Sequence, residues 1–426
     1  MKVLISTMPT TGHVNPFLPV AVELVKRGHE VVWHTSDLYR AKVEATGARF
    51  SAYNKAPDFL KIPVKQDNGA SGLTAIIGIM RRLFVDRMAG QLADYRFILR
   101  TFPADVLLVD MCSLGALALQ DFGGPVYATL GINPLVTPDP EIPMFGAGGP
   151  PATTWFSQTW NWCMHWMART LFNPRMLKLV NDERLGLGLE PYGKELEFFD
   201  MMRSRFLHIM PVTMALEYRR RNMLRQVHFV GPLIPAPPTN FDPPSWWGDL
   251  DTHKGKIVHV TQGTYRIDEV NLIRPTISAL QNEDVLLIVT SPNADTALAD
   301  VPPNARVADF IPHPLLLPYV DCMITNAGYN GVLTALAYGV PLVCAGRTED
   351  KADVSGRVEW SGAGIDLKTD KPNEAQIRDA VRKVLGEAKF RDNAHRVKED
   401  FGKHESAKEA CILLETLAET KAPILS

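Results

Sequence analysis

The sequence predicts an α/β fold made of two similar domains, each built around a parallel sheet. Short apolar segments of strand length alternate with longer segments in which apolar residues recur at helical spacing. This alternation occurs in both halves of the chain, and a proline-rich linker at 231–252 separates the halves. Alternating strands and helices are typical of parallel sheets. The 426 residues also exceed the usual size of one hydrophobic core.

The start of the chain predicts a complete β-α-β unit. Residues 3–6 form an apolar strand, and apolar residues then recur at helical spacing from Phe17 to Val25. Gly28 ends this helix, and residues 30–33 form the next strand. Further strands are predicted at 106–109, 125–129, 257–260, 285–289 and 322–325.

We expect an N-terminal domain over residues 1–230 and a C-terminal domain over residues 253–406. Residues 138–206 interrupt the alternation, because Pro and Gly cluster before a segment rich in Trp and Met. This composition predicts a helical, aromatic rim on the first domain. Residues 407–426 include an amphipathic helix that we expect to cross back to the first domain.

The composition argues against several classes of function. The 45 basic and 47 acidic residues almost cancel, and no Lys/Arg block occurs, so nucleic acid is not an expected partner. The five cysteines are scattered without zinc spacing, which predicts reduced thiols, no metal site and a cytoplasmic protein. Gly, Asn and Pro interrupt the longest uncharged stretch, 322–346, so no transmembrane segment is expected.

Two candidate catalytic residues follow strands of the first domain. In open parallel sheets, ligands bind beyond the carboxyl ends of the strands. His13 follows the first strand, and its imidazole can take a proton from a hydroxyl group near neutral pH. Asp110 follows residues 106–109, and its carboxylate can orient an imidazole and stabilise its charged form. Alternatively, His13 caps or packs a helix, and Asp110 caps the helix that begins near Leu114.

A third candidate site is segment 325–336, where a strand, a turn rich in Gly and Asn, and a helix follow one another. Small residues let backbone amides face a ligand, and a helix N-terminus favours an anion. The segment has no Gly-Lys-Ser/Thr, so it suits a diphosphate held without a metal rather than a Walker A site. A plain strand-to-helix turn is the alternative interpretation.

In their order along nearly the whole chain, these motifs resemble those of the family-1 glycosyltransferases. That family has the GT-B fold, uses UDP-sugars or dTDP-sugars and inverts the anomeric carbon. Residues 12–16, Gly-His-Val-Asn-Pro, are similar to the loop of its catalytic base. Asp110 matches the Asp that orients this base. The resemblance implies two facing Rossmann-like domains with an interdomain cleft, and His13 as the general base.

The resemblance also implies where the donor binds. Residues 260–264 are similar to a loop whose last hydroxyl residue contacts the donor, and residues 310–313 fall where the family holds uracil. Residues 326–331 fall on the phosphate motif, and residues 348–351 on the pair that holds sugar hydroxyls. The implied donor contacts are Gly12, Thr264, Phe310, Ile311, His313, Asn326, Gly328, Asn330, Gly331, Glu349, Asp350 and Lys351.

The chain departs from the family pattern at four positions. Asn326 replaces the phosphate-binding His, and Gly331 replaces a Ser. Thr334 replaces the ribose-binding Glu, and Lys351 replaces the final Gln. These changes resemble those of a microbial subgroup that glycosylates natural products of the macrolide type. They leave both UDP-sugars and dTDP-sugars open as donors.

The aromatic segment suggests where the acceptor binds. Trp155, Trp160 and Met164 are the candidate acceptor contacts, and a packed lid is the other interpretation of these residues. We expect transfer of a hexose, with UDP-glucose as the favoured donor, to a small hydrophobic acceptor such as a phenolic, polyketide or lipid-like aglycone. No cofactor is implied, since the nucleotide sugar is a substrate, and we expect a monomer or weak dimer.

The sequence is less consistent with two other functions. A sugar-nucleotide epimerase of the same fold needs no hydrophobic acceptor site, so the Trp-rich segment argues against it. A non-catalytic auxiliary subunit needs no general base, so the presence of both His13 and Asp110 argues against that class.

Overall fold

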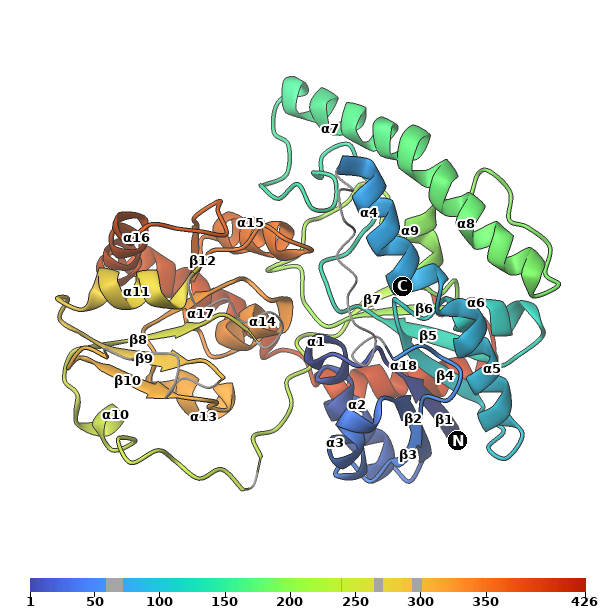
Figure 1. Ribbon diagram of the computed structural model, residues 1–426, viewed down its shortest axis with the longest axis horizontal. Helices are drawn as coiled ribbons and strands as arrows, with labels where there is room; N and C mark the ends of the chain where they lie inside the picture. The colour runs from blue at the N-terminus through green and yellow to red at the C-terminus, as the bar shows by residue number, and fades with distance from the viewer. Residues whose placement is uncertain (59–71, 239, 264–270, 293–300) are drawn as a thin grey trace.

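The computed structural model describes residues 1–58, 72–238, 240–263, 271–292 and 301–426, and it contains two α/β domains (Figure 1). The N-terminal sheet has seven strands in the order β3-β2-β1-β4-β5-β6-β7, and the C-terminal sheet has six in the order β10-β9-β8-β11-β12-β13. Every strand pair in both sheets is parallel. The predicted fold class of two domains with parallel sheets is confirmed.

The strands are short apolar segments, most of them fully buried, as expected where helices cover both faces of a parallel sheet. The N-terminal strands are β1 (Lys2–Ser6), β2 (Glu30–Thr35), β3 (Arg49–Ala52), β4 (Val106–Asp110), β5 (Val126–Leu130), β6 (Leu207–Met210) and β7 (Val227–Phe229). The C-terminal strands are β8 (Lys256–Thr261), β9 (Val285–Thr290), β10 (Ala305–Ala308), β11 (Cys322–Thr325), β12 (Leu342–Cys344) and β13 (Gly364–Asp366).

Each sheet reverses its strand order at one point, and this reversal places the candidate site. In the first sheet the chain moves outward from β1 to β2 and β3, then returns to add β4 on the other side of β1. In the second sheet, β8 and β11 have the same relation. The loops after such neighbouring strands diverge and open a crevice at the carboxyl ends of the strands. We therefore expect a ligand to bind at the carboxyl ends of β1 and β4 in the N-terminal domain, and at those of β8 and β11 in the C-terminal domain.

Helices connect the strands in both domains. Those of the N-terminal domain are α1 (Thr11–Val14), α2 (Phe17–Lys26), η1 (Asp37–Tyr39), α3 (Arg40–Glu44), α4 (Gly72–Met80), η2 (Arg81–Val85), α5 (Met88–Leu99), α6 (Leu114–Asp121), α7 (Trp155–Met167), η3 (Ala168–Phe172), α8 (Asn173–Gly186) and α9 (Phe198–Met201). Those that follow are α10 (Asp249–Thr252), α11 (Ile273–Leu280), α13 (His313–Leu316), η4 (Leu317–Tyr319), α14 (Tyr329–Ala337), α15 (Lys351–Ser361), α16 (Glu374–Gly386), α17 (Ala388–Phe401) and α18 (Ser406–Thr420).

The last helix, α18, lies in the N-terminal domain, against α2 and the sheet (Figure 1). Its buried residues Cys411, Leu414 and Leu417 belong to the same hydrophobic core as the strands of that domain. At its outer side, Glu415 accepts hydrogen bonds from the guanidinium of Arg27 at 2.6 and 2.8 Å. The chain therefore ends on the domain in which it begins.

A buried ion pair joins the two domains. Glu217, in the loop after β6, accepts hydrogen bonds from the Arg357 guanidinium of α15 at 2.6 and 3.1 Å. The two side chains are 0% and 5% exposed. Nearby, the Asp353 carboxylate accepts the backbone N–H groups of Gly146 and Gly148 at 2.7 and 3.0 Å. A charge removed from water in this way needs its partner, so these contacts set how the domains meet.

No helix within the described residues is both long enough and apolar enough to cross a membrane. The longest rod of the N-terminal domain is instead the consecutive run α7, η3 and α8, which forms the rim predicted for residues 138–206 (Figure 1).

Candidate active site

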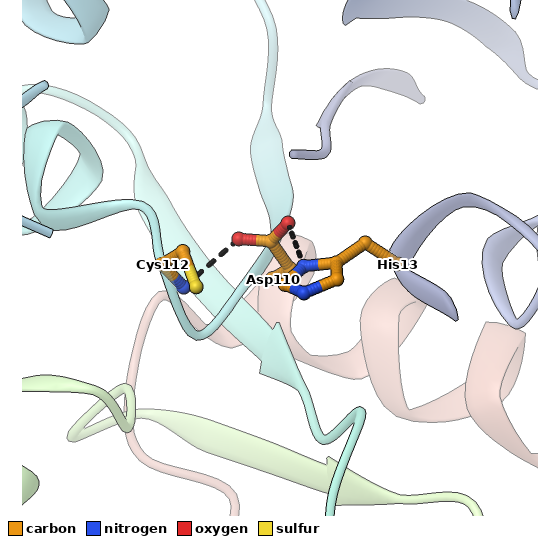
Figure 2. A group of neighbouring side chains, drawn as sticks. All are labelled: His13, Asp110 and Cys112. Atoms are coloured by element: carbon orange, nitrogen blue, oxygen red, sulfur yellow. Dashed lines mark hydrogen bonds and ion pairs between the residues drawn. The ribbon is translucent and has the colours of Figure 1, made fainter. Parts of the chain in front are cut away.

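His13 and Asp110 meet at the crevice between β1 and β4 (Figure 2). His13 lies in α1, just after β1, and Asp110 is the last residue of β4. Because β1 and β4 are parallel neighbours, the loops at their carboxyl ends emerge side by side. His13 Nδ1 lies 2.8 Å from Asp110 Oδ2, and the two side chains are 14% and 0% exposed. A carboxylate only accepts, so Nδ1 carries the proton and Nε2 is the basic nitrogen.

The surroundings of Asp110 keep its carboxylate charged. Burial alone raises the pKa of Asp110, but the charge and hydrogen bond of His13, the Met8 amide and the charge of Arg87 outweigh it and hold the pKa below its ordinary value. Met8 N–H donates to Oδ2 at 2.5 Å, and Cys112 N–H donates to Oδ1 at 2.9 Å. The carboxylate is thereby fixed in one orientation and can stabilise an imidazolium on His13.

Asp110 is not the N-cap of α6, which is Ser113, but it does bind the turn that leads into this helix. Its Oδ1 accepts the Cys112 amide and the Ser113 hydroxyl, at 2.9 and 3.3 Å, in the turn that leads into α6. One oxygen therefore orders this turn, while the other holds His13. The residue serves the local structure and the candidate dyad together.

Cys112 completes a group of three potential metal ligands with His13 and Asp110, whose ligand atoms lie within 4.8 Å of one another. Both carboxylate oxygens already accept N–H groups, and burial together with the Asp110 charge raises the pKa of the Cys112 thiol well above its ordinary value. The hydrogen bonds among these residues are therefore those of a His–Asp dyad, with a neutral thiol beside it.

The C-terminal domain contacts the N-terminal domain beside His13. Asn330, in the first turn of α14, donates from Nδ2 to the backbone carbonyl of Gly12 at 2.7 Å. Gly12 directly precedes His13, so the helix that is predicted to bind the diphosphate lies beside the candidate base. Two of the predicted donor contacts, Gly12 and Asn330, thus lie side by side and are joined by a hydrogen bond.

The predicted phosphate turn lies between β11 and α14. Gly328 is the N-cap of α14, and a Cβ on Gly331 would meet nothing closer than His313 Cε1 at 4.0 Å. The backbone here is open to a ligand. Asn326, in contrast, donates from Nδ2 to the Gln262 carbonyl at 2.5 Å, which ties the turn to the loop after β8. Thr264, predicted in that loop, lies outside the described residues.

The residues predicted to hold the nucleobase differ in exposure. Ile311 is buried at 2%, whereas the Phe310 ring is 66% exposed and presents an open aromatic plane. His313 stacks edge-on against the buried His259, with ring centroids 5.6 Å apart. Burial lowers the pKa of His313 to about 4 and that of His259 to about 3. Both rings are therefore neutral at physiological pH, and neutral imidazole can both donate and accept.

The predicted sugar-binding residues lie at the start of α15. The Lys351 ammonium donates to Glu349 at 2.7 Å and to the Thr348 hydroxyl at 3.0 Å. Asp350 is the N-cap of the helix, and burial raises its pKa to about 7. Three residues in sequence thus offer an exposed carboxylate, a carboxyl group that titrates near neutrality, and an ammonium.

The aromatic rim holds a cavity, but with different residues from those predicted. A cavity of about 220 Å³ lies under the rim, and Trp162 and Trp166 of α7 contribute to its wall. Phe145, Phe172, Phe199 and Tyr218 also line the cavity.

Trp155 and Trp160 lie on the outer side of α7, 77% and 62% exposed, and Met164 is half-buried. None of these three residues lines the cavity. Their contact with an acceptor stays a prediction.

Two functional contacts were beyond sequence reasoning. The Glu217–Arg357 pair joins residues 140 positions apart, and the Asn330–Gly12 bond joins residues 318 positions apart. Neither pair belongs to a local motif. The sequence offered one indication of the first pair, because Arg357 is a charged residue next to the apolar residues Val354 and Val358 of α15.

Comparison with known proteins places the chain among glycosyltransferases. Residues 274–417 match the family described as "Erythromycin biosynthesis protein CIII-like, C-terminal domain". The chain is 40% identical over 420 residues to 4'-demethylrebeccamycin synthase of Lentzea aerocolonigenes, covering 98% of this chain and 99% of that protein. It is 30% identical over 437 residues to UDP-glucosyltransferase A1 of Starmerella bombicola, covering 98% and 92%.

A solved structure shows the same fold at lower sequence identity. The spinosyn rhamnosyltransferase SpnG complexed with thymidine diphosphate aligns with a TM-score of 0.69 and 21% identity, over 98% of this chain and 100% of that one. At this identity the likeness concerns the fold, which is GT-B. From the full-length relatives, the fold and the order of its motifs, the chain belongs to the family-1 natural-product glycosyltransferases.

Proposed function

We propose that this glycosyltransferase moves a hexose from a nucleotide sugar to a hydroxyl of a small hydrophobic acceptor, with inversion and without a catalytic metal. The observation that carries the proposal is the hydrogen bond between His13 Nδ1 and the buried carboxylate of Asp110, 2.8 Å long. This bond holds the proton on Nδ1 and makes Nε2 a base in the cleft between the two domains.

The reaction is a single displacement. The acceptor oxygen attacks the anomeric carbon, the bond from that carbon to the diphosphate breaks, and His13 Nε2 takes the hydroxyl proton. Asp110 stabilises the imidazolium that forms. The leaving diphosphate carries the negative charge, and the N-terminal amides of α14, near Gly328 and Gly331, would stabilise it.

For the donor, we favour UDP-glucose and keep dTDP-sugars as the other class. One relative is named a UDP-glucosyltransferase, and one structural neighbour holds thymidine diphosphate. The exposed Phe310 ring can stack on either pyrimidine, and the neutral His313 can hydrogen-bond a base or ribose without adding charge. Glu349, Asp350 and Lys351 would then meet the sugar hydroxyls.

For the acceptor, the support is the apolar cavity under the rim. Its aromatic walls favour a flat or extended hydrophobic aglycone, of the phenolic, polyketide or lipid-like kind. The relative named 4'-demethylrebeccamycin synthase fits a natural-product acceptor. A panel of UDP- and dTDP-sugars against phenolic and macrolide acceptors, followed by mass shift, tests both specificities.

The test of the mechanism is His13→Ala. Binding of UDP, measured by calorimetry, should persist because no donor contact is removed. Turnover should fall by about 10²–10⁴-fold, the usual contribution of a general base. His395→Ala, at an exposed site on α17, is the matched control and should retain wild-type turnover. Transfer at the wild-type rate by His13→Ala would refute the base assignment.

A further inference from the structure

Helix α7 carries a row of exposed tryptophans. Trp155, Trp162 and Trp166 follow one another at intervals of seven and four residues, which places them in one line along a helix. They are 77%, 57% and 54% exposed. Exposed tryptophan is uncommon, because each ring leaves a large apolar area in water.

A second row lies beside the first. Phe156, Trp160, Met167 and Leu171 follow at intervals of four, seven and four residues and are 67%, 62%, 38% and 47% exposed. We call the seven residues of the two rows the aromatic face of α7. A contiguous apolar surface of this kind marks a site of interaction with a partner or a membrane.

The hydroxyl groups within this face do not need water. Thr159 Oγ1 donates to the Trp155 carbonyl, and Thr170 Oγ1 donates to the Trp166 carbonyl, both at 2.8 Å. The cost of moving the face out of water is therefore small, since a buried hydroxyl is unfavourable mainly when it lacks a hydrogen bond.

The helices that form this face carry arginine but no acidic residue. Residues 155–172 contain Arg169 and no Asp or Glu, although the whole chain has 47 acidic residues. Residues 72–85, which form α4 and η2, contain Arg81 and Arg82 and likewise no Asp or Glu. Arg81 and Arg169 form ion pairs with carboxylates outside these helices, and exposed pairs of this kind are weak and exchangeable.

Helix α4 carries further exposed apolar side chains. Its Ile76 and Ile79 side chains are 48% and 45% exposed. The continuing η2 packs against α8, which itself continues α7 and η3, and Figure 1 shows α4 and α7 at the same end of the N-terminal domain. This end is thus apolar on two helices, with arginine as its charged component.

We propose that the aromatic face of α7, together with α4, docks on the surface of a lipid bilayer that contains anionic lipids. Tryptophan is enriched at membrane–water interfaces, and helices with an apolar face and flanking arginine lie in the plane of such an interface. Arginine also pairs well with lipid phosphate.

The docked orientation has a consequence for the cavity. Trp162 and Trp166 belong to the aromatic face and also line the cavity under the rim. The surface that contacts the bilayer therefore borders the cavity directly. Docking itself requires neither donor nor acceptor, so it can be tested apart from the proposed reaction.

The test is flotation of the full-length protein with vesicles of phosphatidylcholine containing about 30% phosphatidylglycerol. The informative variant is Phe156→Ser/Trp160→Ser. The matched control is Leu38→Ser/Phe97→Ser, which removes two side chains that are 72% and 62% exposed elsewhere on the domain. Thermal unfolding of both variants verifies that the replaced surface residues leave the fold intact.

We expect the wild type and the control to float with the vesicles, and the Phe156→Ser/Trp160→Ser variant to partition about tenfold more weakly or worse. Vesicles of phosphatidylcholine alone, or high salt, should weaken binding of the wild type. Equal binding by both variants, or no binding by the wild type, would overturn the proposal. A concentration-dependent dimer that only the α7 variant abolishes, without vesicle binding, would assign the face to a second copy.

Discussion

Replacing Asp110 by Asn separates the charge of this residue from its role in orientation. In the native site, Oδ2 accepts N–H groups from Met8 and His13 at 2.5 and 2.8 Å, while Oδ1 accepts from Cys112 N–H and the Ser113 hydroxyl. An amide has one oxygen and one NH₂ group. If the NH₂ group takes the position of Oδ2, it faces two donors, the N–H groups of Met8 and His13. If it takes the position of Oδ1, it faces the N–H of Cys112 and the hydroxyl of Ser113, which can rotate to accept a hydrogen bond.

The second orientation is therefore favoured, and it keeps an oxygen on His13 Nδ1. What is lost is the charge that stabilises the imidazolium. A hydrogen bond to a charged group contributes about 1 kcal/mol more than a neutral one. The Coulomb energy of two charges about 4 Å apart at an effective dielectric constant of 20 sets an upper value of about 4 kcal/mol. With about 1.4 kcal/mol for each factor of ten, these energies of about 1 to 4 kcal/mol predict that kcat falls about 5- to 10³-fold.

The assay is a double-mutant cycle on sugar transfer, with wild type, Asp110→Asn, His13→Ala and the double variant. Because Asp110 acts through the imidazole, Asp110→Asn should change kcat by less than about threefold when His13 is absent. UDP binding and thermal unfolding control for damage near Cys112. An equal loss of kcat in both backgrounds would refute the reasoning, since Asp110 would then act without His13.

Two further predictions concern the domain interface and the start of α15. Glu217→Gln leaves the buried Arg357 without its counter-charge, so it should lower the free energy of unfolding in denaturant titrations by about 3–5 kcal/mol. The control Glu141→Gln, at the exposed pair with Arg221, should lower the free energy of unfolding by less than about 1 kcal/mol. Similar losses in the two variants would contradict a buried interdomain pair. For Asp350, burial raises the pKa to about 7, above its unfolded value, so its ionisation destabilises the fold progressively from about pH 4 to pH 7. Asp350→Asn should therefore raise the melting temperature more at pH 8 than at pH 4.5 without donor, and equal changes at both pH values would speak against it.

Much of the site was accessible from sequence because it follows strand ends. His13 and Asp110 each come directly after an apolar strand, and the carboxyl ends of parallel strands form one edge. The pairing of β1 with β4 was the one missing step, since nothing local to either strand specifies its neighbour. Six short strands of three or four residues each were not predicted, because so few residues give little periodicity: β3, β6, β7, β10, β12 and β13.

The direction of side chains on the rim could not be read from composition. Trp155 and Trp162 lie on the same helix and both are exposed, yet only Trp162 borders the cavity. The helix packs through Asn161, which is 7% exposed and donates to the Pro140 carbonyl at 3.3 Å. A polar residue is thus the most buried one on α7, whereas the Trp and Phe side chains of this helix are all more than half exposed. This is the reverse of the usual amphipathic pattern, in which apolar residues face the core.

Two of the contacts between the domains, at Glu217 and at Asn330, differ in strength. The Glu217–Arg357 pair is buried, so breaking it strands a charge away from water. The Asn330–Gly12 hydrogen bond is exposed, and water can replace it at a net cost of about 1 kcal/mol. Of these two contacts, the hydrogen bond of Asn330 is therefore the easier one to break. Because Gly12 adjoins His13, the weaker contact is the one beside the base, where donor and acceptor have to enter.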